Sequence, residues 1–354
     1  MILWQRAPRI SVFLLALWLA APAVAEEAPA VPDPAGFDPW LEGVREEALA
    51  SGISAELLDR VLAAVEFNPR VIELDRRQPE FTLTFERYME TRVTRDRIAR
   101  GREKSAEFDH LLAAVGDRYG VGGRFIAAIW GMETNYGSHS GGMDVIGSLA
   151  TLAYDTRRSA FFRKELIAAL RILDEGHIDF AAMKGSWAGA MGQSQFMPTS
   201  FHAYAQDFDG DGRRDIWLNP ADVFASIANY LKRHNWQGDL SWGREVVLPE
   251  GFGTFKAEIA QERPPLACRR ALKEHSRQLP LSDWRDMGVR GANGDELPRN
   301  GILASLVRPA GNEGPAFLTY ANYRSILSYN CSNFYALAVG HIADALLAEP
   351  EPSE

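Results

Sequence analysis

The chain contains little cysteine, little histidine and less basic than acidic charge, and each shortage excludes a class of site or partner. Its 354 residues include 2 cysteines and 7 histidines. The histidines, His139 and His177 among them, lack the spacing of a zinc site. The 47 acidic residues outnumber the 38 basic residues, which gives a net charge of −9 at pH 7. That charge disfavours binding to nucleic acids and to anionic membranes, so neither is expected as a partner.

Two motifs of common enzyme classes are also missing. No glycine-rich phosphate loop precedes a helix pattern, and no Gly-x-Ser-x-Gly nucleophile motif occurs. The sequence therefore predicts neither a nucleotide site nor a serine nucleophile, and no cofactor is expected for catalysis.

A long hydrophobic run occurs at the N-terminus. Arg6 and Arg9 precede the apolar run 10–21, and Ala23-Val-Ala25 follows it, which predicts a signal peptide over residues 1–25. Residues 26–37, rich in Glu, Ala and Pro, are expected to form a disordered leader. The run is short for a membrane span, although an uncleaved anchor is the alternative. No cysteine follows the run to carry a lipid. We therefore expect an exported, soluble periplasmic protein with no stable membrane anchor after cleavage, which lowers the net charge to −11.

Export bears on the two cysteines, Cys268 and Cys331. In an oxidising compartment they can form a disulfide, and two buried free thiols are the alternative.

The hydrophobic patterns predict a mainly α (α+β) fold. Helical periodicity is clear over 38–62, 82–102, 166–173, 223–231 and 334–347, and strand patterns occupy 244–248, 302–307 and 316–320. Residues 309–315, with two glycines and two prolines, are typical of a hairpin loop between the last two strands. The expected divisions are an α-helical domain (38–110), a catalytic core (111–236), a small β-containing domain (237–315) and a return segment with the C-terminal helix (316–354).

Glu133 is the candidate catalytic residue. Ile126, Ile129 and Trp130 precede it at helical spacing and share its face. A carboxyl group on an apolar face is poorly solvated when ionised, so its pKa is expected to rise, as a general acid for a glycosidic bond requires. The alternative is a solvated or capping carboxylate at a helix end.

Residues 184–198 combine small residues with amide side chains and aromatics. Gln193 and Gln195 can hydrogen-bond sugar hydroxyls, and glycines permit close approach of a ligand to the backbone. A tight loop whose glycines only relieve steric clashes is the alternative.

Residues 207–215 have the pattern of a calcium loop. Asp207, Asp209 and Asp211 occupy positions 1, 3 and 5, glycine occupies position 6, and the carbonyl of Arg213 falls at position 7. Position 12 is Leu218 rather than Glu, so Asp222 is the nearest later carboxylate that could close a longer loop. We expect a structural Ca²⁺ ion, with a plain Asp/Gly-rich turn as the alternative.

Arg157 and Arg158 lie near aromatic residues. Guanidinium groups suit carboxylates or polar ligands in a cleft, and a solvated charged face is the alternative.

Four segments in this order resemble the B-type lytic transglycosylases, bacterial enzymes that cleave the glycan strands of peptidoglycan. They are the segment around Glu133, the segment 185–198, the acidic loop followed by Asn229-Tyr230, and Ser328-Tyr329-Asn330. The resemblance covers about residues 38–347. Gln193-Ser194 departs from the Tyr-Gly pair that many members carry.

The resemblance implies a lysozyme-like catalytic core with an α-helical flank and a small β-containing domain. It implies that Glu133 acts first as acid and then as base, without water, to give 1,6-anhydro-muramoyl ends. It places Ser186, Gln195, Tyr230, Tyr329 and Asn330 in the glycan cleft, with Arg157 and Arg158 reaching the peptide stem or glycan. The alternatives are a hydrolytic muramidase, which needs a second carboxylate, and an inactive calcium-dependent peptidoglycan-binding protein.

Overall fold

The computed structural model describes residues 31–77, 83–256, 258–261 and 266–347. The chain divides after Val31, and Pro32–Glu354 forms the unit considered below. The signal peptide predicted over 1–25 lies outside the described residues. None of the helices in the described ranges has the length and apolar character that a membrane crossing requires.

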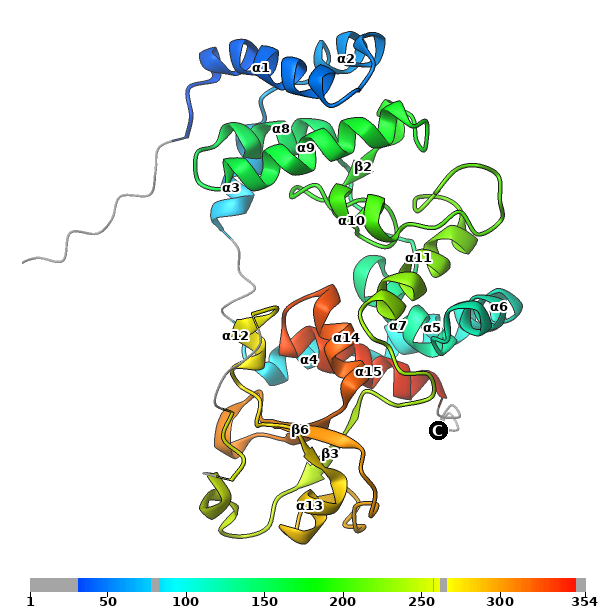
Figure 1. The fold of residues 1–354 in the computed structure, drawn as a ribbon, viewed down its shortest axis with the longest axis vertical. Helices are drawn as coiled ribbons and strands as arrows, with labels where there is room; N and C mark the ends of the chain where they lie inside the picture. The colour runs from blue at the N-terminus through cyan, green and yellow to red at the C-terminus, as the bar shows by residue number, and fades with distance from the viewer. Residues whose placement is uncertain (1–30, 78–82, 257, 262–265, 348–354) are drawn as a thin grey trace, which may run out of the picture. The chain divides into compact units, whose positions relative to one another are not determined.

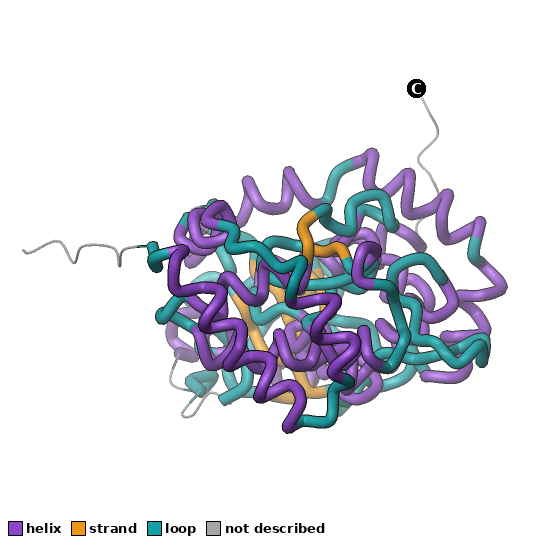
Figure 2. Tube along the Cα trace, turned by 90° about the horizontal axis from the view of Figure 1, so that it is seen from above, coloured by secondary structure: helices purple, strands orange, loops and turns teal. Residues whose placement is uncertain are grey.

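Helices make up most of the described chain (Figures 1 and 2). The α-helices are α1 (Phe37–Ala50), α2 (Ala55–Leu62), α3 (Pro69–Arg76), α4 (Phe85–Arg92), α5 (Arg95–Glu107), α6 (Asp109–Tyr119), α7 (Gly123–Thr134), α8 (Val145–Tyr154), α9 (Ser159–Asp174), α10 (Pro198–Tyr204), α11 (Pro220–Arg233), α12 (Arg269–Leu272), α13 (Leu281–Asp286), α14 (Ala321–Tyr329) and α15 (Asn333–Leu347). Short 3-10 helices occur at η1 (Pro34–Gly36), η3 (Phe180–Ala182), η4 (Phe252–Lys256) and η5 (Gly311–Glu313).

The predicted leader ends earlier than residue 37. Asp33 caps η1 by accepting a hydrogen bond from the Ala35 amide, and Phe37 begins α1 with its ring buried. Leu41, Val44 and Ala48 continue that buried face of α1. Residues 33–37, which the sequence placed in the leader, thus take part in a capped 3-10 helix and in a hydrophobic core.

The prediction of one continuous helix over 82–102 is wrong. Two helices occupy this segment, because α4 ends at Arg92 and α5 begins at Arg95. Thr94 has an extended backbone, and its hydroxyl accepts a hydrogen bond from the Arg97 amide, which starts α5 as a new helix. The sequence pattern did not reveal this break, because the charged residues of α4 and α5 follow one helical period across it.

The β region contains one five-stranded antiparallel sheet in the order β4-β6-β7-β3-β5. Its strands are β3 (Gly243–Val247), β4 (Leu279–Pro280), β5 (Arg290–Gly291), β6 (Leu303–Val307) and β7 (Ala316–Thr319). Leu306 pairs with Leu318, and Val246 pairs with Ala316, so β7 lies at the centre of the sheet. The predicted hairpin over 309–315 is confirmed. The boundary predicted at 315 falls between β6 and the central strand β7, and the domain divisions stay a prediction.

Three hydrophobic cores organise the fold, and they do not follow the predicted domains. One contains buried residues of α1–α3 with those of α8–α10. A second joins α6, α7, α11, α14 and α15, together with Phe85 of α4. The third lies between the sheet and α13. The segment 38–110 therefore contributes buried residues to two of these cores.

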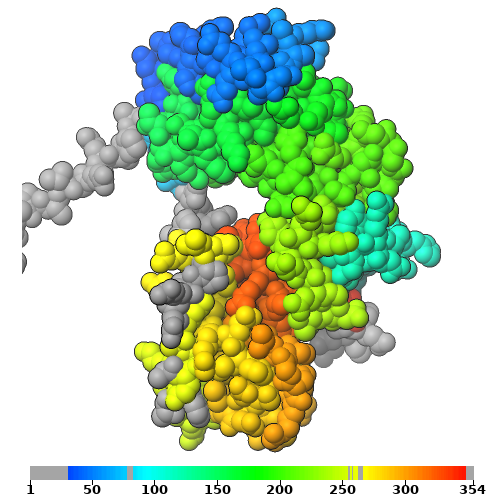
Figure 3. Space-filling view, in the orientation of Figure 1, coloured from blue at the N-terminus to red at the C-terminus, as the bar shows by residue number. Residues whose placement is uncertain are grey.

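The C-terminal helices return to the earlier helices, as predicted. Helix α15 packs on α4, α5 and α7, and the β region lies beside the C-terminal helices in Figure 3. Tyr329, the last residue of α14, packs against both helical cores. The structure joins Cys268 to Cys331 in a disulfide, with the Cα atoms 4.9 Å apart, which confirms the predicted pairing.

Candidate active site

Glu133 lies in the last turn of α7, at the end of a buried apolar helix. Ile126, Ile129 and Trp130 are all buried, while Glu133 is half-buried. The helix ends because Asn135 and the next residue adopt left-handed backbone angles, with φ values of 50° and 62°. The apolar helix predicted from the sequence is confirmed, and it presents one carboxylate at its end.

Tyr335 of α15 holds that carboxylate. Its hydroxyl donates a hydrogen bond to Glu133 Oε1 at 2.5 Å. Burial and the negative charge of Glu133 raise the pKa of Tyr335 well above its usual value, so the phenol stays protonated and remains a donor. Sequence reasoning missed this residue, because 202 positions separate the two side chains and a tyrosine in an apolar helix is typical of a core.

The segment 184–196 forms a tightly folded loop. The strand β2 (Lys184–Gly185) pairs with β1 (Met143–Asp144), and Met191 bridges both Gly185 and Phe196. Ser186 Oγ accepts hydrogen bonds from the amides of Ala188 and Ala190 at 3.3 and 3.0 Å.

Three residues of this loop, Gly189, Gly192 and Gln195, are held in left-handed conformations. Gln195 has a φ of 50°, and its side-chain amide donates to the carbonyls of Ser140 and Gly192. Gly192 has a φ of 63°, and a Cβ atom there would lie 2.6 Å from the Ile216 carbonyl oxygen. The glycine is therefore required by the close approach of two backbones.

Gln193 fastens the loop to the helix that carries Glu133. Its side-chain oxygen accepts from Trp130 Nε1 at 2.8 Å, and its amide group donates to the Trp217 carbonyl at 2.8 Å. Thr134, which follows Glu133, donates to the Gln193 carbonyl at 3.2 Å. The residue that departs from the family pattern thus connects the loop to the end of α7.

Tyr230 and Tyr329 lie together at the other side of this loop. Their ring centroids are 4.7 Å apart. Tyr329 donates to the Ser194 carbonyl at 2.7 Å, and Tyr230 donates to the Ser328 carbonyl at 2.6 Å. Burial, together with the charge of Glu133, raises the pKa of Tyr329 well above its usual value, so the hydroxyl stays protonated and remains a donor.

Asn330 follows as the exposed C-cap of α14, next to the disulfide. The structure therefore gathers the segments that carry Glu133, Ser186, Gln195, Tyr230 and Tyr329.

A cavity of about 460 Å³ adjoins Glu133 on the side of α5. It is lined by Arg92, Thr94, Asp96, Arg97, Arg100, Met132, Glu133, Thr134, Asn135 and His139. Sequence reasoning missed the residues contributed by α4 and α5, because their charge pattern is typical of a solvated helix.

Arg157 and Arg158 make different contacts from those expected. Both guanidinium groups pair with the carboxylate of Asp75, a buried residue of α3. Burial of that carboxylate is compensated by the two cations, so the pair fixes α3 to the turn between α8 and α9. These contacts favour a structural role, and no described contact joins either arginine to Glu133 or to the loop 184–196.

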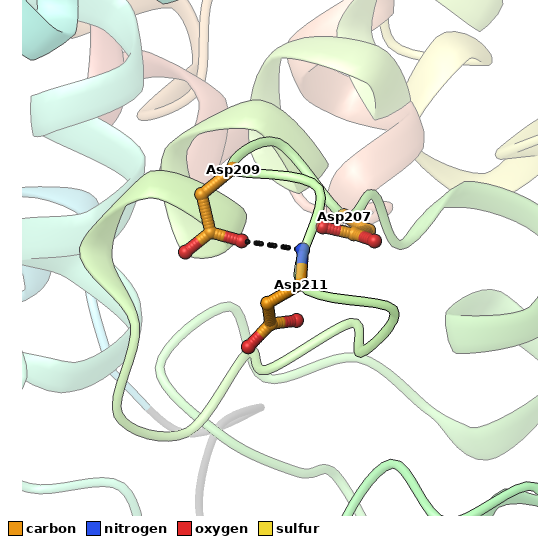
Figure 4. A group of neighbouring side chains, drawn as sticks. All are labelled: Asp207, Asp209 and Asp211. Carbon is orange, nitrogen blue, oxygen red and sulfur yellow. Dashed lines mark hydrogen bonds between the residues drawn. The ribbon is translucent and has the colours of Figure 1, made fainter.

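The acidic loop gathers three carboxylates, as predicted. One oxygen from each of Asp207, Asp209 and Asp211 lies within 4.8 Å of the others (Figure 4). The loop is shaped by amide hydrogen bonds, in which Gly210 and Gly212 donate to Asp207 at 2.7 and 2.9 Å. Three converging carboxylate oxygens fit a hard cation such as Ca²⁺, which would offset their mutual repulsion.

Asp222 does not join this group of three. It is fully buried, and its two oxygens accept hydrogen bonds from the amides of Phe208 and Asp215, both at 2.7 Å. Asp222 thus closes the base of the loop through these hydrogen bonds, and its role as a calcium ligand stays a prediction. Arg213 donates its amide to Asp211 at 2.8 Å, and the use of its carbonyl as a ligand stays a prediction.

Comparison with known proteins agrees with this arrangement. A family described as "Transglycosylase SLT domain" matches residues 36–344. Membrane-bound lytic murein transglycosylase B of Escherichia coli K12 is 33% identical over 267 residues, which are 73% of this chain and 66% of that protein. The chain thus spans slightly less than two thirds of that relative.

Solved structures are similar over most of the chain. SltB3 from Pseudomonas aeruginosa, in complex with NAG-anhNAM-pentapeptide, is 47% identical with a TM-score of 0.80, covering 88% of this chain and 79% of that one. The Escherichia coli lytic transglycosylase Slt35, in complex with calcium, is 27% identical with a TM-score of 0.69, covering 87% and 92%.

The likeness confirms the predicted fold class, a mainly α structure of the lysozyme-like type with small β elements. The named relatives are lytic transglycosylases, so the expectation of an enzyme from that group agrees with the comparisons. With a match over residues 36–344, the chain belongs to the transglycosylase SLT domain family.

Proposed function

We propose that this chain is a lytic transglycosylase that cleaves the bond between N-acetylmuramic acid and N-acetylglucosamine in peptidoglycan. The observation that carries the proposal is the Glu133 carboxylate, held by Tyr335 at the end of an apolar helix and beside the folded loop 184–196. A half-buried carboxyl group with one fixed hydrogen bond suits proton transfer at a defined atom.

In the first step Glu133, protonated, gives its proton to the glycosidic oxygen as the bond to the muramoyl C1 breaks. The substrate's own N-acetyl oxygen stabilises the positive charge that develops at C1. The Tyr335 hydroxyl strengthens its hydrogen bond as Glu133 becomes a carboxylate, because bonds to charged acceptors are stronger than bonds to neutral ones.

In the second step the Glu133 carboxylate takes the proton of the muramoyl C6 hydroxyl while that oxygen bonds to C1. The product is a 1,6-anhydro sugar, no water is consumed, and Glu133 is again protonated for the next turnover. One carboxylate is sufficient for both steps.

The remaining cleft residues are proposed to bind the glycan. Tyr230 and Tyr329 have their hydroxyls committed to backbone carbonyls, so their rings are the parts that can contact sugar faces. Ser186 and Asn330 orient the N-acetyl group or Glu133, and Gln195, in the same loop as Ser186, contributes to glycan binding.

The acidic loop is proposed to hold a structural Ca²⁺ ion through Asp207, Asp209 and Asp211. The three carboxylates fit such an ion, and the Slt35 structure was solved with calcium. The proposed site of action is the periplasm, where an exported protein meets peptidoglycan.

Hydrolysis of the same bond is the second candidate reaction, and it is supported by a second carboxylate close to Glu133. Asp96 lines the same cavity as Glu133 and is a carboxylate that could activate water. Asp144 and Asp155, the other acids near this region of the sequence, are engaged elsewhere. Asp144 caps α8 through the Gly147 amide, and Asp155 is buried 3.8 Å from Arg76.

The substitution Glu133→Gln tests the proposed catalytic role. We expect loss of soluble-product release from purified peptidoglycan, while cosedimentation of the variant with peptidoglycan is kept. Near-normal turnover by Glu133→Gln would reject the assignment. Loss caused by Asp96→Asn as large as that of Glu133→Gln would favour the hydrolytic reaction.

A further inference from the structure

Three arginines from α4 and α5 face the cavity beside Glu133. Arg92, Arg97 and Arg100, here named the arginine cluster, line it together with His139, Thr94 and the acids Asp96 and Glu133. Arg92 and Arg100 are exposed, and Arg97 is half-buried. The cavity therefore has an excess of positive charge next to the proposed catalytic acid, although the chain as a whole is acidic.

The contacts of the arginine cluster are with neutral groups. Arg97 donates to the Arg92 carbonyl, Arg100 donates to Ser138 Oγ at 3.4 Å, and Arg92 lies over the Tyr88 ring at 5.7 Å. Within the described part of the chain, none of the three forms an ion pair with a carboxylate.

The guanidinium group of Arg97 is destabilised by burial and by repulsion from its neighbour Arg92. Burial and the neighbouring charge of Arg92 lower its pKa below the usual value. An anion placed between these guanidinium groups would relieve that repulsion. The contrast with Arg157 and Arg158 is clear, because those two already share the carboxylate of Asp75.

The substrate class of the proposed function limits which anion can reach this cavity. The glycan of peptidoglycan carries neutral hydroxyl and N-acetyl groups, and its carboxylates belong to the peptide stem on the muramoyl sugar. Glu133 must contact the glycosidic oxygen of that same sugar. A stem carboxylate is therefore the substrate anion closest to a cavity that Glu133 itself lines.

Resting on the proposed function, we propose that Arg92, Arg97 and Arg100 bind a carboxylate of the peptide stem on the muramoyl residue at the scissile bond. The cluster then selects glycan that carries acidic stems over glycan whose stems are neutral. The contribution of the arginine cluster to substrate binding falls as the salt concentration increases, because two of the three arginines are exposed and their charges are screened.

The test compares two synthetic tetrasaccharides of alternating N-acetylglucosamine and N-acetylmuramic acid. Both carry pentapeptide stems, with free carboxylates in one and carboxamides in the other. For the unmodified protein we expect about tenfold higher kcat/KM on the free acid, mainly through KM, since hydrogen bonds to charged groups contribute this much. The double variant Arg97→Gln/Arg100→Gln should lose about that factor on the acid and less than about twofold on the amide.

Arg95→Gln is the matched control, because Arg95 lies on the same helix and does not line the cavity. Equal losses on both substrates in the double variant, or no preference in the unmodified protein, would overturn the inference. Binding of both tetrasaccharides to Glu133→Gln, measured by calorimetry, tests the preference without turnover. Failure of the proposed function is distinguished by its own result, namely the absence of 1,6-anhydro products from both substrates.

Discussion

Removal of the Tyr335 hydroxyl is the perturbation that reports most directly on how the site works. Tyr335→Phe keeps the buried ring and deletes the 2.5 Å hydrogen bond to Glu133 Oε1. A hydrogen bond to a charged group contributes about 1.5–3 kcal/mol, and less when the acceptor is neutral. Because Glu133 becomes charged as it gives up its proton, most of this energy is gained in the transition state rather than in the bound substrate.

The expected loss is therefore roughly 10- to 100-fold in kcat, with KM nearly unchanged. The assay is the initial rate of soluble-product release at several peptidoglycan concentrations. Tyr323→Phe is the matched control, since the Tyr323 hydroxyl is also buried and donates to Asn333 Oδ1 at 3.0 Å. It should lower stability and leave kcat within about twofold. A Tyr335→Phe variant with unchanged kcat would refute the reasoning.

Three further predictions concern stability. The Cys268–Cys331 disulfide closes a 63-residue separation, so Cys331→Ser should lower the free energy of unfolding by about 4 kcal/mol in urea titrations, and a loss under about 1 kcal/mol would contradict this. Burial lowers the pKa of His275 to about 4, so the unfolded chain binds more protons between pH 6.5 and 4. The contribution of His275 to the free energy of unfolding is therefore fully present above pH 6.5, and about 3 kcal/mol of it is lost as the pH falls to 4. His275→Gln should make the free energy of unfolding depend less steeply on pH in this range, and an unchanged dependence would disprove the assignment. Calcium should raise the melting temperature, and Asp209→Asn/Asp211→Asn should abolish the rise; a full rise in that variant would place the ion elsewhere.

Local patterns predicted those features that depend on short stretches of chain. The apolar face before Glu133 predicted α7, and the alternating positions of the acidic loop predicted the meeting of Asp207, Asp209 and Asp211. The glycines and prolines over 309–315 predicted the hairpin between β6 and β7. In each case the residues that determine the structure lie within about fifteen positions of one another.

Features that depend on distant contacts were missed. Tyr335 meets Glu133 only because α15 packs on α7, which no local pattern reveals. The pairing of Arg157 and Arg158 with Asp75 was also not foreseen, because Asp75 lies more than eighty positions earlier in the sequence. The arginines of α4 and α5 have the same periodicity whether they face solvent or a cavity, and only the packing of α5 on α7 distinguishes the two.

The identity of the new chain ends in digested peptidoglycan tests the central claim most directly. Mass spectrometry of the soluble muropeptides released by the mature protein should show products one water lighter than hydrolytic fragments, with no reducing end. Glu133→Gln should release none of them. Products with reducible ends would contradict the single-carboxylate mechanism and indicate hydrolysis, with Asp96 as the acid to examine next.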